Sequence, residues 1–320
     1  MSRLKKCPHS ACFAPDLTCA LGNQSPSACP EWKNEPTPAS GTDDHSDDDL
    51  RLPWSGHALG LIDATFVSGR ERPFVVALVG PHNAGKTTLL AAWYLLLARG
   101  HRAKPEHCFS GSYSLSGWEE ISAWLQWNPA ALPSFPPHTA SNADRSPGLL
   151  HLAFTGNRKS RRDYLFSNAP GEWFHKWAVN RESDETKGAR WLGQHADAFL
   201  LVADREALSG ENRGAARGAL LLLIQRLASE LKGRPIALVW TKKDIAVDEL
   251  MERAVRDAVV RHVPEVVEFS TTVFDDSNEG ATGVGFQELL AWILELRHAS
   301  GELPQSNTEA SDPLLVYGLR

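Results

Sequence analysis

A glycine-rich loop carries the residues with the clearest chemical meaning in this sequence. Residues 80–88 read GPHNAGKTT and fit the pattern G-x-x-x-x-G-K-[ST]. Glycines let such a loop wrap closely around phosphate, and its backbone N–H groups, with the N-terminus of the following helix, bind the anion. We expect Lys86 to reach the β- and γ-phosphates of a nucleotide and the Thr87 hydroxyl to bind Mg²⁺. The predicted phosphate-binding residues are Gly80, Pro81, His82, Asn83, Ala84, Gly85, Lys86, Thr87 and Thr88.

A second motif, TKKD at residues 241–244, directly follows an apolar run and resembles the guanine-specificity motif N/T-K-x-D of GTPases. A carboxylate there can accept hydrogen bonds from guanine N1–H and the 2-amino group, which adenine cannot supply in that arrangement. Such a site rejects the wrong base because its buried polar groups would go unpaired. An ordinary polar loop is the alternative. The predicted base-binding residues are Thr241, Lys242 with its stem along the base, Asp244, and Ser270 in the last base-contacting loop.

A third stretch, YLFSNAPGE at residues 164–172, looks like the D-x-x-G switch of GTPases. In that pattern the Gly171 N–H contacts the γ-phosphate, and Glu172 stands where the Ras-like group carries a water-orienting glutamine. Asn168 departs from the pattern, because an aspartate there holds the hydration shell of Mg²⁺ and asparagine lacks the charge. Asparagine in place of aspartate therefore puts tight Mg²⁺ binding and fast turnover in question. The predicted catalytic residues are Lys86, Gly171, Glu172 and Asn83.

The first switch is expected between the first and third motifs, where a serine or threonine would bind Mg²⁺. Ser112 and Ser114 in the sequence GSYSL are the candidates, with Ser114 preferred and Thr139 in reserve. The predicted Mg²⁺ ligands are therefore Thr87, Asn168 and Ser114.

Three further stretches narrow the resemblance to the bacterial double-GTPase group, in the translation-factor-related branch of P-loop GTPases. They are GSYSLSGW, NAPGEWFHKWA and GARWLGQHADAFLLVADREALSG, starting at residues 111, 168 and 188, and the resemblance covers about residues 72–298. It implies a switch that binds GTP and GDP with Mg²⁺ and hydrolyses GTP. It also implies a component of multi-protein conflict or defence systems, with a second GTPase-like or effector protein as partner.

Asn83 adds a hypothesis about a second cation. Some GTPases with P-N-x-G-K-S loops use the asparagine at the position of Asn83 to bind K⁺, which replaces an arginine finger. We therefore expect K⁺ to stimulate hydrolysis. The alternative is that Asn83 only stabilises the loop. Arginines that would act as fingers in this chain are Arg158, Arg161, Arg162 and Arg190, although a partner can equally supply one.

Four cysteines lie close together near the N-terminus, with spacings of four, six and nine residues between them. Four thiolates suffice for a tetrahedral zinc site, but no C-x₂-C pair is present. Free thiols and disulfides are the alternatives, and disulfides are disfavoured in a reducing compartment. The predicted zinc ligands are Cys7, Cys12, Cys19 and Cys29.

Composition bounds the organisation of the chain and its partners. A net charge of −6 argues against general nucleic-acid binding and against electrostatic docking on anionic lipid. The apolar stretches fall short of a membrane span, and no secretory signal is visible, so the expected compartment is the cytoplasm. The predicted divisions are a cysteine-containing segment with an acidic linker at 1–52, a P-loop GTPase domain at 53–300, and a flexible tail at 301–320.

The elements that must position the motifs alternate between short apolar strands and helices. This alternation predicts an α/β fold, a P-loop G domain with a mostly parallel sheet and helices on both faces. Residues 105–148 hold six prolines and predict an irregular insertion with one short helix at 118–127. Strands are expected at 74–79, 151–155, 163–167, 198–203, 235–240 and 266–270, and helices at 86–99, 218–232 and 286–298.

Three functions remain open from the sequence. The first is an enzyme, a switch whose segments around 111–118 and 168–177 are ordered by GTP and released by hydrolysis. The second is a module that senses guanine nucleotide with little turnover, because Asn168 weakens Mg²⁺ binding. The third is an ATPase or kinase-like protein in which TKKD is coincidental, and the position of TKKD after its own strand opposes it.

Overall fold

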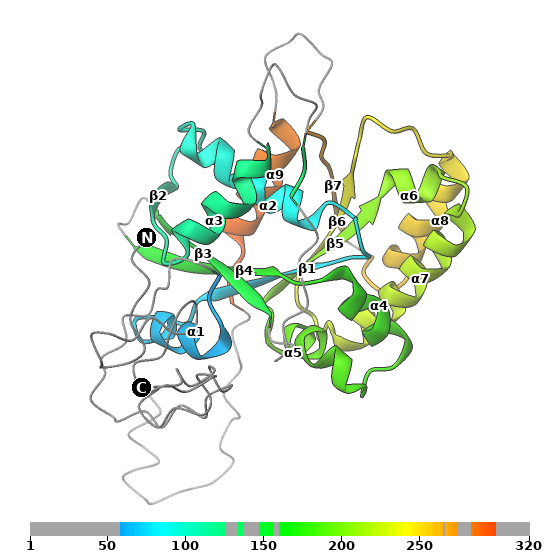
Figure 1. Ribbon diagram of the computed structural model, residues 1–320, viewed down its shortest axis with the longest axis horizontal. Helices are drawn as coiled ribbons and strands as arrows, with labels where there is room; N and C mark the ends of the chain where they lie inside the picture. Colours follow the sequence, from blue (N-terminus) through cyan, green and yellow to red (C-terminus); the bar gives the residue numbers. More distant parts are fainter. Residues whose placement is uncertain are drawn as a thin grey trace, which may run out of the picture. The chain divides into compact units, whose positions relative to one another are not determined.

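A central sheet organises the part of the chain that the structure describes. The structure is a computed structural model, and it describes residues 58–125, 134–136, 147–156, 160–264, 266–273 and 283–298, all within the unit Leu52–Arg320. Seven strands form the sheet in the order β2-β3-β4-β1-β5-β6-β7 (Figure 1). In chain order they are β1 (Phe74–Val79), β2 (Cys108–Gly111), β3 (Gly148–Thr155), β4 (Arg161–Asn168), β5 (Ala198–Asp204), β6 (Ile236–Thr241) and β7 (Val267–Ser270).

Five neighbouring strands are parallel, and near one edge β3 alone runs in the opposite direction. β4, β1, β5, β6 and β7 run in the same direction, whereas β3 pairs antiparallel with both β4 and β2. The predicted pair of strands around residue 156 is therefore a hairpin of β3 and β4. The predicted fold class, a mostly parallel sheet with helices on both faces, is confirmed.

Helices cover both faces of the sheet because the central strands are apolar on both sides. In β1, Val75, Ala77 and Val79 pack into one cluster with α4, α5, α7 and α8, whereas Phe74 and Val76 pack into the other with α2, α3 and α9. Figure 1 shows α2, α3 and α9 together on one side of the strands. The helices are α1 (Leu61–Ser68), α2 (Lys86–Ala98), α3 (Leu115–Ser122), α4 (Gly171–Val179), α5 (Lys187–His195), α6 (Arg205–Ser209), α7 (Arg213–Glu230), α8 (Glu249–Val260) and α9 (Val284–Glu295).

The insertion between α2 and β3 is more regular than predicted in its described part. β2 forms an edge strand, and α3 begins at Leu115 rather than at residue 118 and continues as a 3₁₀ turn at Ala123–Leu125. Trp118 is completely buried against Phe166 and explains the position of α3 on the sheet. The predicted boundaries at residues 52 and 300 lie outside the described residues and stay predictions. Within the described ranges, no helix has the length and apolarity needed to cross a membrane.

Candidate functional site

The phosphate-binding loop connects β1 to α2 at the carboxyl ends of the parallel strands. β1 lies between β4 and β5, at the point where the strand order changes direction, and open α/β sheets bind ligands at such points. Two glycines allow the loop to fold tightly. A Cβ on Gly80 would lie 2.9 Å from the Val202 carbonyl oxygen, and Gly85 has a φ of 81° at the N-terminus of α2. The loop therefore directs its backbone toward the crevice above β1.

Lys86 is a buried cation inside this loop. Its Nζ donates to the carbonyl oxygens of Gly80 at 3.0 Å and Pro81 at 2.7 Å, and it lies 6.0 Å from the centre of the Phe174 ring. Burial lowers the pKa of Lys86 to about 8, against the opposing effect of the Glu172 charge. Two neutral carbonyls compensate a buried ammonium poorly, so the environment of Lys86 fits an anionic ligand such as a polyphosphate.

Oxygen atoms from two predicted Mg²⁺ ligands meet beside the loop. The Thr87 hydroxyl donates to Asn168 Oδ1 at 3.2 Å, which brings the start of α2 to the end of β4. Mg²⁺ prefers oxygen ligands and is bound in nucleotide sites by one or two protein groups together with phosphates and water. The two residues fit that role, and no cluster of three or more His, Cys, Asp or Glu side chains able to hold a metal occurs in the described residues.

The start of α4 is pressed against the phosphate loop. A Cβ on Gly171 would lie only 2.3 Å from the backbone nitrogen of His82 and 2.5 Å from the Pro81 carbonyl carbon. The next side chain, Glu172, reaches the loop as well, with 2.5 Å between its Oε1 and Nδ1 of His82. The third motif therefore lies directly on the first, and the two share a pocket that Gly85, Lys86 and Gly171 help to line.

Glu172 is held in its ionised form at this junction. Burial on its own raises the pKa of Glu172, but the backbone N–H at the start of α4, His82 and Lys86 outweigh it and lower the pKa. An ionised carboxylate only accepts hydrogen bonds, so Glu172 can orient a water molecule or accept its proton. Orienting the attacking water is the task of the glutamine that the Ras-like group has at this position.

A larger cavity of about 330 Å³ adjoins the phosphate pocket and contains the TKKD motif. Asn83, Gly85, Thr88 and Pro136 line both pockets, so a ligand can extend from one into the other. The second cavity is also lined by Leu89, Thr241, Lys242, Asp244, Ile245, Thr271, Thr272 and Phe286.

Hydrogen bonds fix the base-side motif to the phosphate loop. The buried Thr241 hydroxyl donates to the Ala84 carbonyl oxygen at 3.0 Å. Lys242, with a φ of 56°, donates from Nζ to Asp204 Oδ2 at 2.9 Å, Glu206 Oε2 at 2.7 Å and the Asn83 carbonyl oxygen at 3.3 Å. Burial on its own lowers the pKa of Lys242, but the bonds to Glu206 and Asp204 prevail and raise it. The charged Lys242 side chain thus forms one wall of the cavity.

The loop predicted to contact the base enters the cavity one residue after Ser270. Ser270 pairs with Trp240 at the end of β7 and does not line the cavity, whereas Thr271, Thr272 and Val273 do. The Thr272 hydroxyl donates to Asp244 Oδ1 at 2.5 Å. A four-residue final strand gave no signal precise enough to fix this register from the sequence. Asp204 and Glu206, which bind Lys242, were not predicted either, although Asp204 ends an apolar strand as motif residues do.

The candidates for the first switch lie elsewhere. Ser114 is buried and accepts a hydrogen bond from the His151 backbone nitrogen at 2.7 Å, and Ser112 donates to the His151 carbonyl oxygen at 2.5 Å. Neither serine lines the two pockets, so this structure gives Ser114 a role in joining α3 to β3 instead of a place at the metal. Thr139 lies outside the described residues.

The described arginine candidates do not line the pockets, and the zinc candidates lie outside the described residues. β4 is eight residues long, so Arg161 and Arg162 lie roughly 20–23 Å from its end at Asn168. Arg190 pairs with Glu182 at 2.9 Å, and Arg158 lies outside the described residues. The same holds for Cys7, Cys12, Cys19 and Cys29, so their zinc site stays a prediction.

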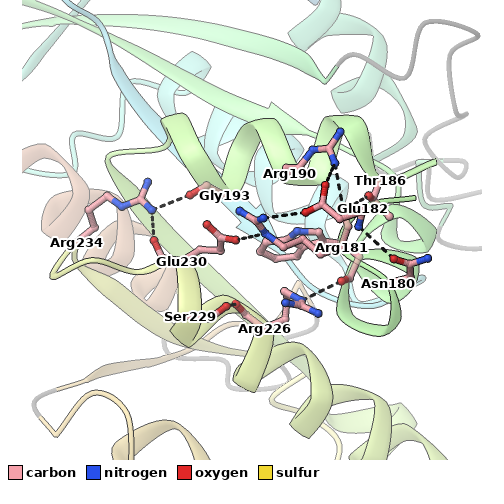
Figure 2. Close-up of polar contacts among 11 residues, drawn as sticks. Asn180, Arg181, Glu182, Thr186, Arg190, Gly193, Arg226, Ser229, Glu230 and Arg234 are labelled. Atoms are coloured by element: carbon pink, nitrogen blue, oxygen red, sulfur yellow. Dashed lines mark hydrogen bonds and ion pairs between the residues drawn. The ribbon is translucent and has the colours of Figure 1, made fainter. Parts of the chain in front are cut away.

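A network of arginines connects α4, α5 and α7 (Figure 2). Arg226 on α7 donates to the Trp177 carbonyl oxygen at 3.1 Å, and Arg181, just after α4, pairs with the buried Glu230 at 2.6 Å. Arg234 donates to the Gly193 carbonyl oxygen at 2.7 Å and so reaches the end of α5. The contacts of Arg226 and Arg181 anchor the C-terminal end of α4, while its N-terminal end touches the phosphate loop.

Taken together, these motifs at the carboxyl edge of a mostly parallel sheet define a P-loop GTPase. A family model described as Double-GTPase 2 matches residues 74–293, which is more than half of the chain. The chain belongs to the Double-GTPase 2 family, and the resemblance noted from the sequence is confirmed.

The chain has matches among solved structures and none among the curated proteins compared with it. None of the curated proteins compared with it matches significantly. Among solved structures it is similar to the small GTPase Arl6 (BBS3) of Trypanosoma brucei with bound nucleotide analogue GppNp, at 15% identity and a TM-score of 0.34. That alignment covers 70% of this chain and 96% of the other, and at this TM-score it adds no argument.

Proposed function

We propose that this protein is a guanine-nucleotide switch that hydrolyses GTP to GDP and phosphate. The observation that carries the proposal is the contact between the start of α4 and the phosphate loop, where Gly171 packs on His82. That contact brings a backbone N–H, an ionised carboxylate and a buried lysine to one pocket. Phosphoryl transfer needs little more from a protein than positioning and charge stabilisation of this kind.

Each residue has a distinct role in the proposed reaction. Lys86 binds the β- and γ-phosphates and stabilises the charge that moves between them. The Gly171 N–H binds a γ-phosphate oxygen, and Glu172 orients the attacking water. Thr87 and Asn168 would hold Mg²⁺, which supplies positive charge between the phosphates. Asp244 and Lys242 select guanine through the second cavity.

Steady-state phosphate release tests this proposal. Purified protein with Mg²⁺ is supplied with GTP or ATP, and wild type is compared with Lys86→Ala and with the surface variant Lys187→Ala. We expect release with GTP only, lost in Lys86→Ala and retained in Lys187→Ala. Equal release with ATP, or GTP-dependent release that survives in Lys86→Ala, would contradict the proposal.

A nucleotide sensor with little turnover is the second candidate, and Asn168 is the observation that favours it. Its neutral amide stands beside the Thr87 hydroxyl, where a carboxylate would bind Mg²⁺ more tightly. Asn168→Asp separates the two candidates. A large gain in the hydrolysis rate would indicate that the natural residue limits turnover and that the wild type acts mainly as a sensor.

The cation and partner hypotheses extend the same proposal. K⁺ bound at Asn83 would stimulate hydrolysis, and equal rates in Na⁺ and K⁺ would refute it. The switch would act on a second GTPase-like or effector protein in a conflict or defence system, as the resemblance implies. Capture of a partner by the GTP-loaded form and not by the GDP-loaded form is the expected result.

A further inference from the structure

The contact between His82 and Glu172 links two elements that are far apart in the sequence. His82 belongs to the phosphate loop and Glu172 to the first turn of α4, and 2.5 Å separates His82 Nδ1 from Glu172 Oε1. The backbone beneath them is fixed, because Gly171 is packed against the His82 backbone. The side-chain contact is therefore a consequence of how α4 docks on the loop.

The pair contributes little to stability. The side chains of His82 and Glu172 are 45% and 50% exposed, and ion pairs with such exposure are worth about 0–1 kcal/mol. A contact of this kind explains little about the fold. Its position beside Lys86 and the Gly171 backbone indicates a role in the chemistry of the pocket.

Electrostatics gives that role a physical form. A carboxylate next to a triphosphate is repelled by the phosphate charge, and a free carboxylate rotates away from it. An N–H donor on one carboxylate oxygen opposes both effects, because it offsets charge and fixes the orientation of the group. His82 is placed to donate this hydrogen bond to Oε1 of Glu172.

We propose that His82 is a positioning residue for GTP hydrolysis, which acts by holding the Glu172 carboxylate toward the attacking water. The proposal rests on the proposed function, because it concerns the same reaction at the same pocket. The phosphate loop thus contributes a side chain to the water-orienting machinery in addition to binding phosphate. His82 acts through Glu172 and makes no bond to the reacting atoms.

A double-mutant cycle under single-turnover conditions tests this role. The variants are His82→Ala, Glu172→Ala and the double variant, with His175→Ala as the control because it removes an exposed histidine from the same helix. We expect His82→Ala to slow GTP hydrolysis by about tenfold to a hundredfold, with the dissociation constant for GTP changed less than about threefold. The double variant should be no slower than Glu172→Ala alone, since His82 acts only through that carboxylate.

A conservative variant provides the second measurement. Asn at position 82 places an amide N–H close to where imidazole Nδ1 lies, so His82→Asn should recover most of the lost rate. Additive losses in the cycle, no loss in His82→Ala, or a loss of GTP affinity in His82→Ala would each overturn the positioning role. Wild-type protein that binds GTP without releasing phosphate would instead overturn the proposed function, and the positioning role with it.

Discussion

Replacing Gly171 by alanine tests the docking of α4 on the phosphate loop most directly. The added Cβ would lie 2.3 Å from the His82 nitrogen and 2.5 Å from the Pro81 carbonyl carbon. Ordinary contacts of this kind are about 3.4 Å or longer, and backbone atoms cannot rotate aside as the end of a flexible side chain can. The start of α4 must therefore move away from the loop by roughly 1 Å.

A displacement of this size has a large kinetic effect and a small effect on binding. Misplacing catalytic groups by 1 Å can cost about a hundredfold in rate, because the reacting atoms leave their near-attack geometry. We expect Gly171→Ala to lower single-turnover GTP hydrolysis by about that factor. The affinity for GDP should stay within about threefold of wild type, since Lys86 and the TKKD cavity are untouched.

The assay compares Gly171→Ala with Gly218→Ala, a glycine-to-alanine change on the exposed surface of α7. A Cβ at Gly218 meets nothing within 4 Å, so this variant should hydrolyse GTP at the wild-type rate. It should also unfold at slightly higher denaturant, because alanine favours the helix by about 0.5–1 kcal/mol. A wild-type rate in Gly171→Ala would refute the reasoning, since it would mean that α4 does not contact the loop during hydrolysis.

Three further predictions concern single side chains. Burial lowers the pKa of Lys86 to about 8. The phosphates of bound GDP should restore the positive charge of Lys86. Binding should therefore take up roughly half a proton at pH 8 and almost none at pH 6.5, which calorimetry in buffers of different ionisation enthalpy measures. A binding enthalpy that does not depend on the buffer at pH 8 would contradict this prediction. Asp244→Asn should weaken GTP binding by about tenfold to a hundredfold and strengthen XTP binding, because an amide can donate to the 2-oxo group of xanthine. Competition with a fluorescent nucleotide measures both affinities. Unchanged selectivity between GTP and XTP would count against the role of Asp244 in binding the base. Arg234→Ala should lower the free energy of unfolding in urea by about 1–3 kcal/mol, because carbonyls at the end of α5 lose their donor, whereas Arg217→Ala on the exposed side of α7 should not.

Local patterns predicted the parts of the site that are continuous in sequence. The phosphate loop could be predicted because a buried strand, the glycine spacing and a helix follow one another within about 25 residues. The same holds for TKKD at the end of β6. In both cases the chain itself fixes the distance between the residues, so spacing alone carries the geometry.

Contacts between distant segments could not be predicted in the same way. The pairing of His82 with Glu172 depends on how α4 docks, and neither residue shows it in its local sequence. Ser114 has a hydroxyl that could bind a metal, but in the structure this hydroxyl accepts a hydrogen bond from the His151 backbone N–H on β3. Helix α8 is a different case, because Met251, Val255 and Val259 recur every four residues and are buried, so its sequence pattern alone indicates a helix.

The distribution of charge around the pocket distinguishes this site from the Ras-like pattern. The carboxylate that would hold Mg²⁺ is replaced by the neutral Asn168, and a carboxylate, Glu172, stands where the Ras-like group has a neutral glutamine. Negative charge has thus moved from the metal side of the phosphates to the water side. There it needs a counter-charge, and the depressed pKa of Glu172 reflects Lys86 and His82 among its causes. In the proposed reaction, a histidine in the phosphate loop and a glutamate after the switch glycine therefore belong together, because the histidine would hold the carboxylate in place beside the phosphates.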